Sequence, residues 1–267
     1  MKSSDAIGVF DSGIGGLTVL KEIRGLLPNE DILYFGDTAR VPYGTKSAGT
    51  VGEFASQIVD FLVRQRVKLV VVACNTVSAM ALGHLRDRFK SVPLFGVVEP
   101  GVTAAVNATK NRRIGVIGTV GTVNSHAYRD RLLERDPGIS VFQQACPLFV
   151  PLVETGWTGN RVAELTVSEY LVPLRKKKID TLVLGCTHYP MLKPVIRKVM
   201  GKSVRLVDSA EEISGDVKAY LTLRGLLNGK RKKGKVRCWL SDMSPYSIKA
   251  AGFILREKNI RFALKKF

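Results

Sequence analysis

The sequence predicts an α/β protein made of two similar domains with mostly parallel sheets, related by a pseudo-two-fold axis and facing each other across a cleft. Apolar runs of strand length alternate with helical patterns along the chain, which is typical of parallel sheets covered by helices. Residues 113–119 resemble residues 6–12, and the context of Cys186 resembles that of Cys74. In each pair the two members are about 110 positions apart along the chain, which indicates an internal duplication.

The first half of the chain predicts strands and helices in strict alternation. Apolar runs bounded by turn residues predict the strands, and amphipathic spacing predicts the helices. In chain order they are a strand over 7–10, a glycine-rich turn and helix through Leu27, a strand over 32–35, a helix over 47–65 and a strand over 67–73.

The pattern starts again after Glu99 and ends in a tail too short to form a third domain. We therefore expect a first domain of residues 1–97 plus 208–267 and a second domain of residues 98–207. The crossings near Val98 and Val207 would form a hinge. In the tail we expect a helix over 209–226, a basic turn over 228–234, a strand over 236–240, a helix over 245–258 and a short last strand.

The composition describes an ordinary globular protein with an excess of positive charge. The chain has 267 residues, 45% of them hydrophobic, and a formal net charge of +18. Its apolar runs are too short to cross a membrane, so we expect no membrane partner. Four cysteines without a CxxC pair indicate reduced thiols and a cytoplasmic location. No residues have the spacing of metal ligands, so we expect no metal.

The positive charge gathers in three runs, residues 175–178, 230–237 and 265–266. Nucleic acid is one candidate partner for them, but aromatic residues do not interleave with the runs and no known binding motif accompanies them. We favour a solvated surface, which would still attract an acidic substrate.

A glycine-rich turn, Asp11-Ser12-Gly13-Ile14-Gly15-Gly16, follows the first strand. Its glycines allow close approach of the backbone to a ligand, and the following helix presents amide donors. No Gly-Lys-Ser/Thr follows, so it is no P-loop. A tight turn without a ligand is the plainer interpretation. A second turn, Pro42-Tyr43-Gly44, follows the next strand and could close over a ligand.

Cys74 and Cys186 each follow a predicted strand and precede a helical pattern. Because ligands bind at the carboxyl edge of parallel sheets, matching positions in two halves suggest two thiols facing one pocket. A helix dipole there would lower the pKa of a thiol and supply thiolate at neutral pH. A single cysteine so placed is more often a packing residue, as we expect for Cys146 and Cys238.

Two further groups lie in suggestive positions. His188 follows Cys186 by two residues, and Glu154 ends an apolar stretch. A lone histidine is more often structural than catalytic, and Glu154 could merely end a helix.

Taken together, these motifs resemble glutamate racemases of the aspartate/glutamate racemase family. The resemblance rests on residues 11–19, Pro42-Tyr43-Gly44, Cys74-Asn75-Thr76, Thr119 with Thr122, the Glu154 segment and residues 185–190. It implies a cofactor-independent enzyme that interconverts L- and D-glutamate for peptidoglycan synthesis, commonly as a homodimer.

Racemisation needs an acid on one face of Cα and a base on the other, so we assign Cys74 and Cys186 to these roles. The resemblance implies that Asp11 supports Cys74, and that Glu154 and His188 support Cys186. It implies substrate contacts from Asp11, Ser12, Pro42, Tyr43, Gly44, Asn75, Thr76, Thr119, Thr122, Thr187 and His188.

Two other functions compete with this one. An aspartate racemase or a related amino-acid racemase would use a similar pair of cysteines, although the Asp-Ser-Gly-Ile-Gly-Gly turn and His188 favour glutamate. A binding protein for an acidic ligand could use the same cleft without chemistry, but it would give no reason for matched thiols.

Overall fold

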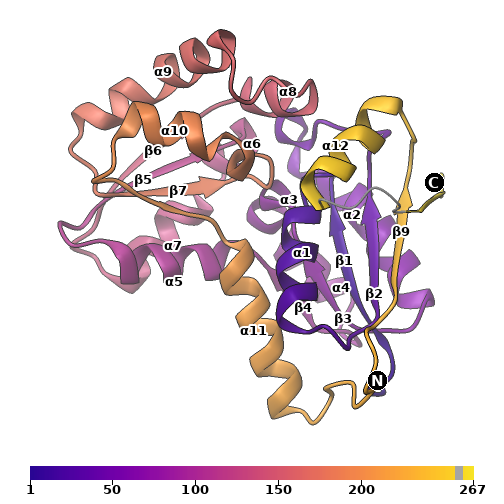
Figure 1. Cartoon of the computed structure of the whole chain (residues 1–267). Helices are drawn as coiled ribbons and strands as arrows, with labels where there is room; N and C mark the ends of the chain where they lie inside the picture. The colour runs from indigo at the N-terminus through magenta and orange to yellow at the C-terminus, as the bar shows by residue number, and fades with distance from the viewer. Residues whose placement is uncertain (256–260) are drawn as a thin grey trace.

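The strands form two sheets, and every strand pair in both is parallel (Figure 1). The computed structural model describes residues 1–255 and 261–267. The first sheet contains β1 (Ala6–Asp11), β2 (Ile32–Gly36), β3 (Val67–Val72), β4 (Leu94–Gly96), β9 (Val236–Leu240) and β10 (Phe262–Leu264). The second contains β5 (Arg113–Gly118), β6 (Ser140–Ala145), β7 (Thr181–Gly185) and β8 (Arg205–Val207).

The strand order repeats between the sheets. The first sheet runs β10-β9-β2-β1-β3-β4 and the second runs β6-β5-β7-β8, so β1 to β4 correspond to β5 to β8. This repeat agrees with the duplication inferred from sequence. The predicted α/β class with two parallel sheets is confirmed.

We call the part built around the first sheet the first lobe. Helices cover both faces of its sheet, which explains why β1, β2 and β3 are buried throughout. One face is covered by α1 (Leu17–Leu26), α11 (Ala210–Leu223) and α12 (Pro245–Leu255). The other face is covered by α2 (Ala48–Arg64), α3 (Asn75–Met80) and α4 (Leu82–Arg88), and the short helix η1 (Tyr43–Thr45) packs beside them.

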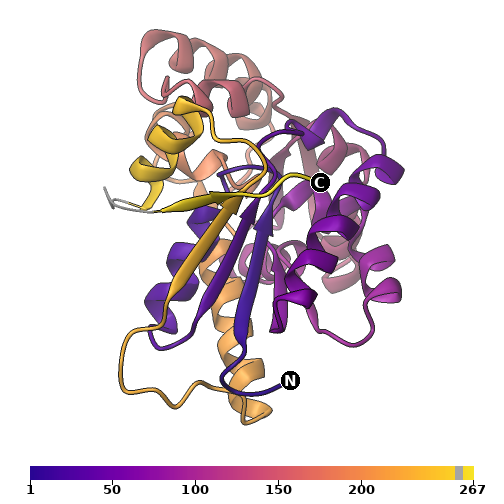
Figure 2. The ribbon, with the colours of Figure 1, turned by 90° about the vertical axis from the view of Figure 1, so that its right-hand side faces the viewer.

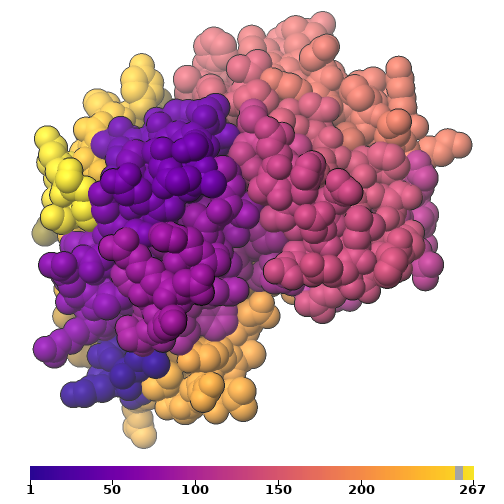
Figure 3. Space-filling view, turned by 180° about the vertical axis from the view of Figure 1, so that it is seen from behind, coloured from indigo at the N-terminus to yellow at the C-terminus, as the bar shows by residue number. Residues whose placement is uncertain are grey.

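The second lobe is built in the same way around its own sheet, and Figure 3 shows the two lobes side by side. One face is covered by α8 (Phe149–Glu154), α9 (Arg161–Lys176), η2 (Tyr189–Leu192) and α10 (Lys193–Met200). The other is covered by α5 (Val98–Ala108) and α7 (Ala127–Arg135), while α6 (Val120–Asn124) follows β5.

The tail returns to the first lobe. Helix α11 packs against α1, and the chain beyond it runs back to place β9 beside β2 (Figure 2). Helix α11 ends three residues before the predicted boundary at Leu226. Gly225 has a φ of 63°, and the amides of Gly225 and Leu226 bond back to Thr222 and Leu221. A glycine in this left-handed conformation stops a helix.

Two expectations about the ends of the tail have different outcomes. The expected strand over 236–240 has the predicted bounds as β9. The expected helix end at Lys258 lies outside the described residues. None of the described helices is long and apolar enough to cross a membrane.

Candidate active site

Cys74 and Cys186 occupy corresponding positions in the two lobes. Cys74 follows β3 and Cys186 follows β7, so each thiol lies at the carboxyl edge of its sheet. Both are buried, with 4% and 6% of their surface exposed. The Sγ of Cys74 donates to Ser12 Oγ at 3.6 Å, and the Sγ of Cys186 lies 4.0 Å from His188 Nδ1.

The surroundings of Cys74 favour its neutral thiol. Burial, followed by the negative charge of Asp11, raises the pKa of Cys74 to about 12. Contacts with the Val77 amide and the Ser12 hydroxyl act in the opposite direction but are weaker. The expectation that the helix dipole would lower this pKa is therefore wrong for Cys74. Helix α3 has six residues, and the effect of its dipole is smaller than the cost of desolvating a thiolate.

Asp11 connects the two lobes from a fully buried position. Its Oδ2 accepts from the Gly13 amide at 3.0 Å, and its Oδ1 accepts from Thr187 Oγ1 of the second lobe at 3.3 Å. Burial raises the pKa of Asp11, although the charge of His188 and several hydrogen bonds oppose the shift. The carboxylate thus lies between the segments that carry the two thiols.

The glycines of the turn are needed for this close approach between lobes. A Cβ on Gly15 would lie 2.4 Å from Thr187 Oγ1, and one on Gly16 would lie 2.5 Å from Asp11 Cβ. Real Cβ atoms do not approach other atoms so closely, so a side chain at Gly15 would push the lobes apart, and one at Gly16 would displace Asp11 within the first lobe.

His188 stands between Cys186 and Glu154. Its Nε2 lies 3.4 Å from Glu154 Oε1, an ion-pair distance without hydrogen-bond geometry. Burial acts to lower the pKa of His188, but Cys186 and Glu154 outweigh it and raise the pKa to about 10. His188 is therefore protonated at neutral pH and places a positive charge beside the Cys186 sulfur.

Three threonine hydroxyls meet across the lobes. Thr76 Oγ1 lies 2.9 Å from Thr119 Oγ1 and 3.4 Å from Thr122 Oγ1. Thr119 also caps α6 by accepting from the Thr122 amide at 3.1 Å. Hydroxyl groups both donate and accept, so this cluster can bind a carboxylate.

The predicted Pro42-Tyr43-Gly44 turn borders the threonine cluster. A Cβ on Gly44 would lie 2.4 Å from Thr119 Cβ, so this turn packs directly on the start of α6. Tyr43 is buried and its hydroxyl donates to Asp37 Oδ2, whereas Pro42 is exposed after a cis peptide bond. Tyr43 is thus placed to shape the site, with its hydroxyl already bonded.

The structure therefore brings most of the predicted residues into one connected set. Direct contacts link Asp11 to Thr187, Cys74 to Ser12, Cys186 to His188 and the threonines to one another. One residue that sequence reasoning missed is Tyr128, which donates to Asn75 Oδ1 at 2.6 Å. No motif marks Tyr128, because its importance arises from a contact between segments far apart in the chain.

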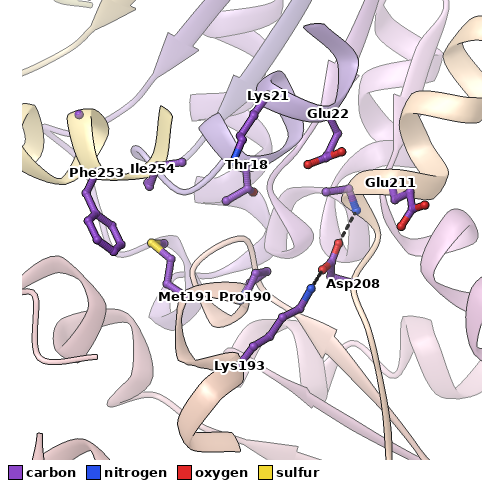
Figure 4. Close-up of a pocket in the computed structure, with 12 residues that line it drawn as sticks. Thr18, Lys21, Glu22, Pro190, Met191, Lys193, Asp208, Glu211, Phe253 and Ile254 are labelled. Carbon is purple, nitrogen blue, oxygen red and sulfur yellow. Dashed lines mark hydrogen bonds and ion pairs between the residues drawn. The ribbon is translucent and has the colours of Figure 1, made fainter. Parts of the chain in front are cut away.

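Sequence reasoning also missed a cavity of about 650 Å³ between residues of α1, η2, α11 and α12 (Figure 4). Thr18 of α1 and Met191 of η2 line it, and Lys193 forms an ion pair with Asp208 at its edge. None of the residues predicted for the site lines it. Among the described residues, no group of three or more His, Cys, Asp or Glu side chains could hold a metal ion.

Two parallel-sheet lobes with buried thiols at matching strand ends are typical of an enzyme, because ligands of open α/β sheets bind at the carboxyl ends of the strands. Comparison with known proteins identifies a single family. The family model of Asp/Glu/hydantoin racemases matches residues 15–213. The glutamate racemase of Geobacter metallireducens is 53% identical over 249 residues, which cover 93% of this chain and 90% of that protein. The glutamate racemase of Chlorobaculum tepidum is 46% identical over 243 residues, covering 91% and 89%.

A solved structure agrees with these relatives. The crystal structure of the Francisella tularensis glutamate racemase in complex with D-glutamate superposes with a TM-score of 0.93 at 39% identity, covering 99% of this chain and 98% of that one. This chain belongs to the Asp/Glu/hydantoin racemase family.

The raised pKa of His188 predicts a pH-dependent contribution to stability. An unfolded histidine has a pKa of 6.5, and folding raises that of His188 to about 10. The folded state therefore binds the proton more tightly, so the stabilisation is fully present below pH 6.5 and is lost as the pH rises through 10. We expect His188→Gln to lose this dependence.

Urea unfolding of the wild type and of His188→Gln, monitored by circular dichroism, checks the prediction. The wild type should exceed the variant in free energy of unfolding most clearly below pH 6.5, and the difference should shrink towards pH 10. A difference that stays constant over this range would show that His188 is not charged in the folded protein.

Proposed function

We propose that this protein interconverts L- and D-glutamate without a cofactor, using Cys74 and Cys186 as proton carriers on opposite faces of the substrate Cα. The observation that carries the proposal is the pair of buried thiols at corresponding strand ends of the two lobes. The glutamate racemases to which the chain is similar support the reaction and the substrate.

The protonation states suggest how one turnover begins. Burial raises the pKa of Cys74 and keeps its thiol protonated, so we assign the starting proton acceptor to Cys186, which lies beside the positive charge of His188. Cys186 would take the Cα proton, and the Cys74 thiol would deliver its own proton to the opposite face. The enzyme then holds a Cys186 thiol and a Cys74 thiolate, which is the state that catalyses the reverse reaction.

Supporting groups would stabilise the charges that develop. The negative charge of Asp11 acts on Cys74, while His188 lies 4.0 Å from the Cys186 sulfur and 3.4 Å from Glu154. We propose that the substrate carboxylates are bound by hydroxyl, amide and backbone donors. These would come from Ser12, Asn75, Thr76, Thr119, Thr122, Thr187 and the turn Pro42-Tyr43-Gly44.

We also propose the domain boundaries, the cellular location, the oligomeric state and the biological role of the enzyme. We propose domain boundaries at 97/98 and 207/208, because the strands of the second sheet all lie between these boundaries and the described strands of the first sheet all lie outside them. Four free cysteines suit a reducing compartment, which supports a cytoplasmic location. A homodimer and a role in supplying D-glutamate for peptidoglycan are proposed from family resemblance.

The basic run over 230–237 lies away from the proposed site. Val236 pairs with Ile32 at the amino-terminal ends of the strands, whereas the thiols lie at the carboxyl ends. Lys230 Nζ is held by Asp31 Oδ2 at 2.7 Å, and Asp31 also binds the Lys235 amide. These contacts favour a solvated surface feature, and we do not favour contact with nucleic acid.

Circular dichroism of each enantiomer with purified protein and no added cofactor tests the proposed reaction. L-glutamate and D-glutamate should each lose their signal and converge on a racemic mixture, while L- and D-aspartate should change far more slowly. If aspartate were converted faster than glutamate, aspartate would be the substrate. No conversion of either amino acid would leave a binding protein as the better account.

Chelation tests whether the chemistry belongs to the protein's own side chains. Prolonged dialysis against a strong chelator, and separate treatment with hydroxylamine to remove any pyridoxal phosphate, should leave kcat and KM unchanged. The reason is that thiols can move the proton without an electron sink or a Lewis acid. Activity that disappears in chelator and returns with an added metal would contradict this expectation.

A further inference from the structure

Tyr128 links the second lobe to the residue beside the first thiol. It belongs to α7, is fully buried, and donates its hydroxyl proton to Asn75 Oδ1 at 2.6 Å. Asn75 directly follows Cys74 and opens α3 in the first lobe. This hydrogen bond therefore forms only when the two lobes are in contact.

The ring of Tyr128 also packs beside the residue that precedes the second thiol. A Cβ on Gly185 would lie 3.2 Å from the Tyr128 ring, and Gly185 is the residue before Cys186. One aromatic side chain thus touches the chain neighbours of both proposed proton carriers. Because aromatic rings are rigid, a shift of Tyr128 would displace both Asn75 and Gly185.

Tyr128 further contacts the chain just beyond each crossing between lobes. A Cβ on Gly101, in the first turn of α5, would lie 3.1 Å from the Tyr128 ring and 3.2 Å from its hydroxyl oxygen. The side chain of Ser209, just before α11, borders the same point, because the Cβ on Gly101 would also lie 3.5 Å from Ser209 Cβ. The position of Tyr128 is therefore set by the two segments expected to act as the hinge.

The bond from Tyr128 decides which end of the Asn75 amide remains available. Because Oδ1 accepts from Tyr128, Nδ2 is the end directed elsewhere, and within residues 1–255 and 261–267 it has no protein acceptor. An amide nitrogen held in this way is a ready donor to a carboxylate oxygen. Without the tyrosine hydroxyl, the amide could rotate and present either end.

We propose that Tyr128 is a positioning residue for substrate binding: it orients Asn75 so that Nδ2 donates to a carboxylate of the bound amino acid, and does so only when the lobes are closed. This inference rests on the proposed function, since it takes an acidic amino acid as the ligand. It adds a link between hinge and site, because the side chain that orients Asn75 packs against Gly101, near Ser209, just beyond the two crossings between lobes.

Tyr128→Phe removes the hydroxyl and keeps the ring. The matched control is Tyr189→Phe, because Tyr189 is equally buried in the same lobe and donates to the Cys146 carbonyl at 2.8 Å. Tyr128→Phe should raise KM for both enantiomers of glutamate about tenfold, the value of one hydrogen bond, and change kcat less than about twofold. Tyr189→Phe should lower the melting temperature to a similar extent and leave KM unchanged.

A double-mutant cycle with Asn75→Ala distinguishes positioning from general loosening of the lobe. If Tyr128 acts through Asn75, Tyr128→Phe should have no further effect on KM, or on the calorimetric Kd for D-glutamate, once Asn75 is alanine. Additive losses would overturn the inference, as would an equal rise in KM in Tyr189→Phe.

The cycle also separates this inference from the proposed reaction. A wild-type protein that binds glutamate but does not racemise it would reject the proposed function, and the calorimetric cycle would still decide the role of Tyr128. A wild-type protein that does not bind glutamate or aspartate would overturn both.

Discussion

Replacing either Cys74 or Cys186 by alanine is expected to abolish racemisation in both directions and to leave the fold intact. Each substitution removes the only proposed proton carrier on one face of Cα. Neither enantiomer can then be converted into the other. General acid–base groups contribute about 10²- to 10⁴-fold, so the rate should fall at least about a hundredfold. Circular dichroism at saturating glutamate measures the rate, and thermal unfolding checks the fold.

Cys146→Ala is the matched control for these variants. Cys146 is also a buried cysteine of the second lobe, and its Sγ contacts only the Gln144 carbonyl among the hydrogen-bond partners in the described chain. Its loss should lower stability slightly and preserve the rate. Racemisation above about a hundredth of the wild-type rate in Cys74→Ala or Cys186→Ala would reject the two-thiol assignment.

Lys68→Met is expected to produce the largest loss of stability of any single change discussed here. Lys68 is fully buried, and its Nζ donates to Glu30 Oε2 at 2.5 Å and to the carbonyls of Ser3 and Leu226 at 2.9 and 2.8 Å. Methionine fills similar space but leaves the Glu30 carboxylate buried without its cation. Breaking a buried pair in this way costs about 3–5 kcal/mol.

Urea unfolding of three proteins tests this account. Lys68→Met should lose about 3–5 kcal/mol of unfolding free energy. The double variant Lys68→Met/Glu30→Gln should recover a large part of it, since the neutral amide needs no counter-ion and can still accept from the Asn228 amide. A loss below about 1 kcal/mol, as for an exposed pair, would show that Glu30 does not depend on Lys68 as its counter-ion.

The strands were predictable because burial on both faces makes them continuous apolar runs. Residues 67–72 and 236–240 could be read from composition and turn signals alone. The end of α11 was harder to place. Its helical pattern continues to Leu226, and the earlier end depends on the left-handed conformation of Gly225.

The site was predictable where it depends on position along a strand. Matching strand ends identify Cys74 and Cys186, and adjacency identifies His188. The protonation state of Cys74 was not predictable, because its pKa depends on burial and on Asp11. Tyr128 was not predictable either, since only the packing of α7 against α3 brings its hydroxyl to Asn75.

Following deuterium at Cα while L-glutamate is converted in D₂O shows whether two thiols exchange the proton. Two thiols on opposite faces require that one removes the substrate proton and the other, equilibrated with solvent, delivers a deuteron. At early times, mass spectrometry should therefore find deuterium at Cα of the D-glutamate formed and protium in the remaining L-glutamate. D-glutamate that retains the original proton, or remaining L-glutamate that gains deuterium as fast as product forms, would contradict a mechanism with two thiols.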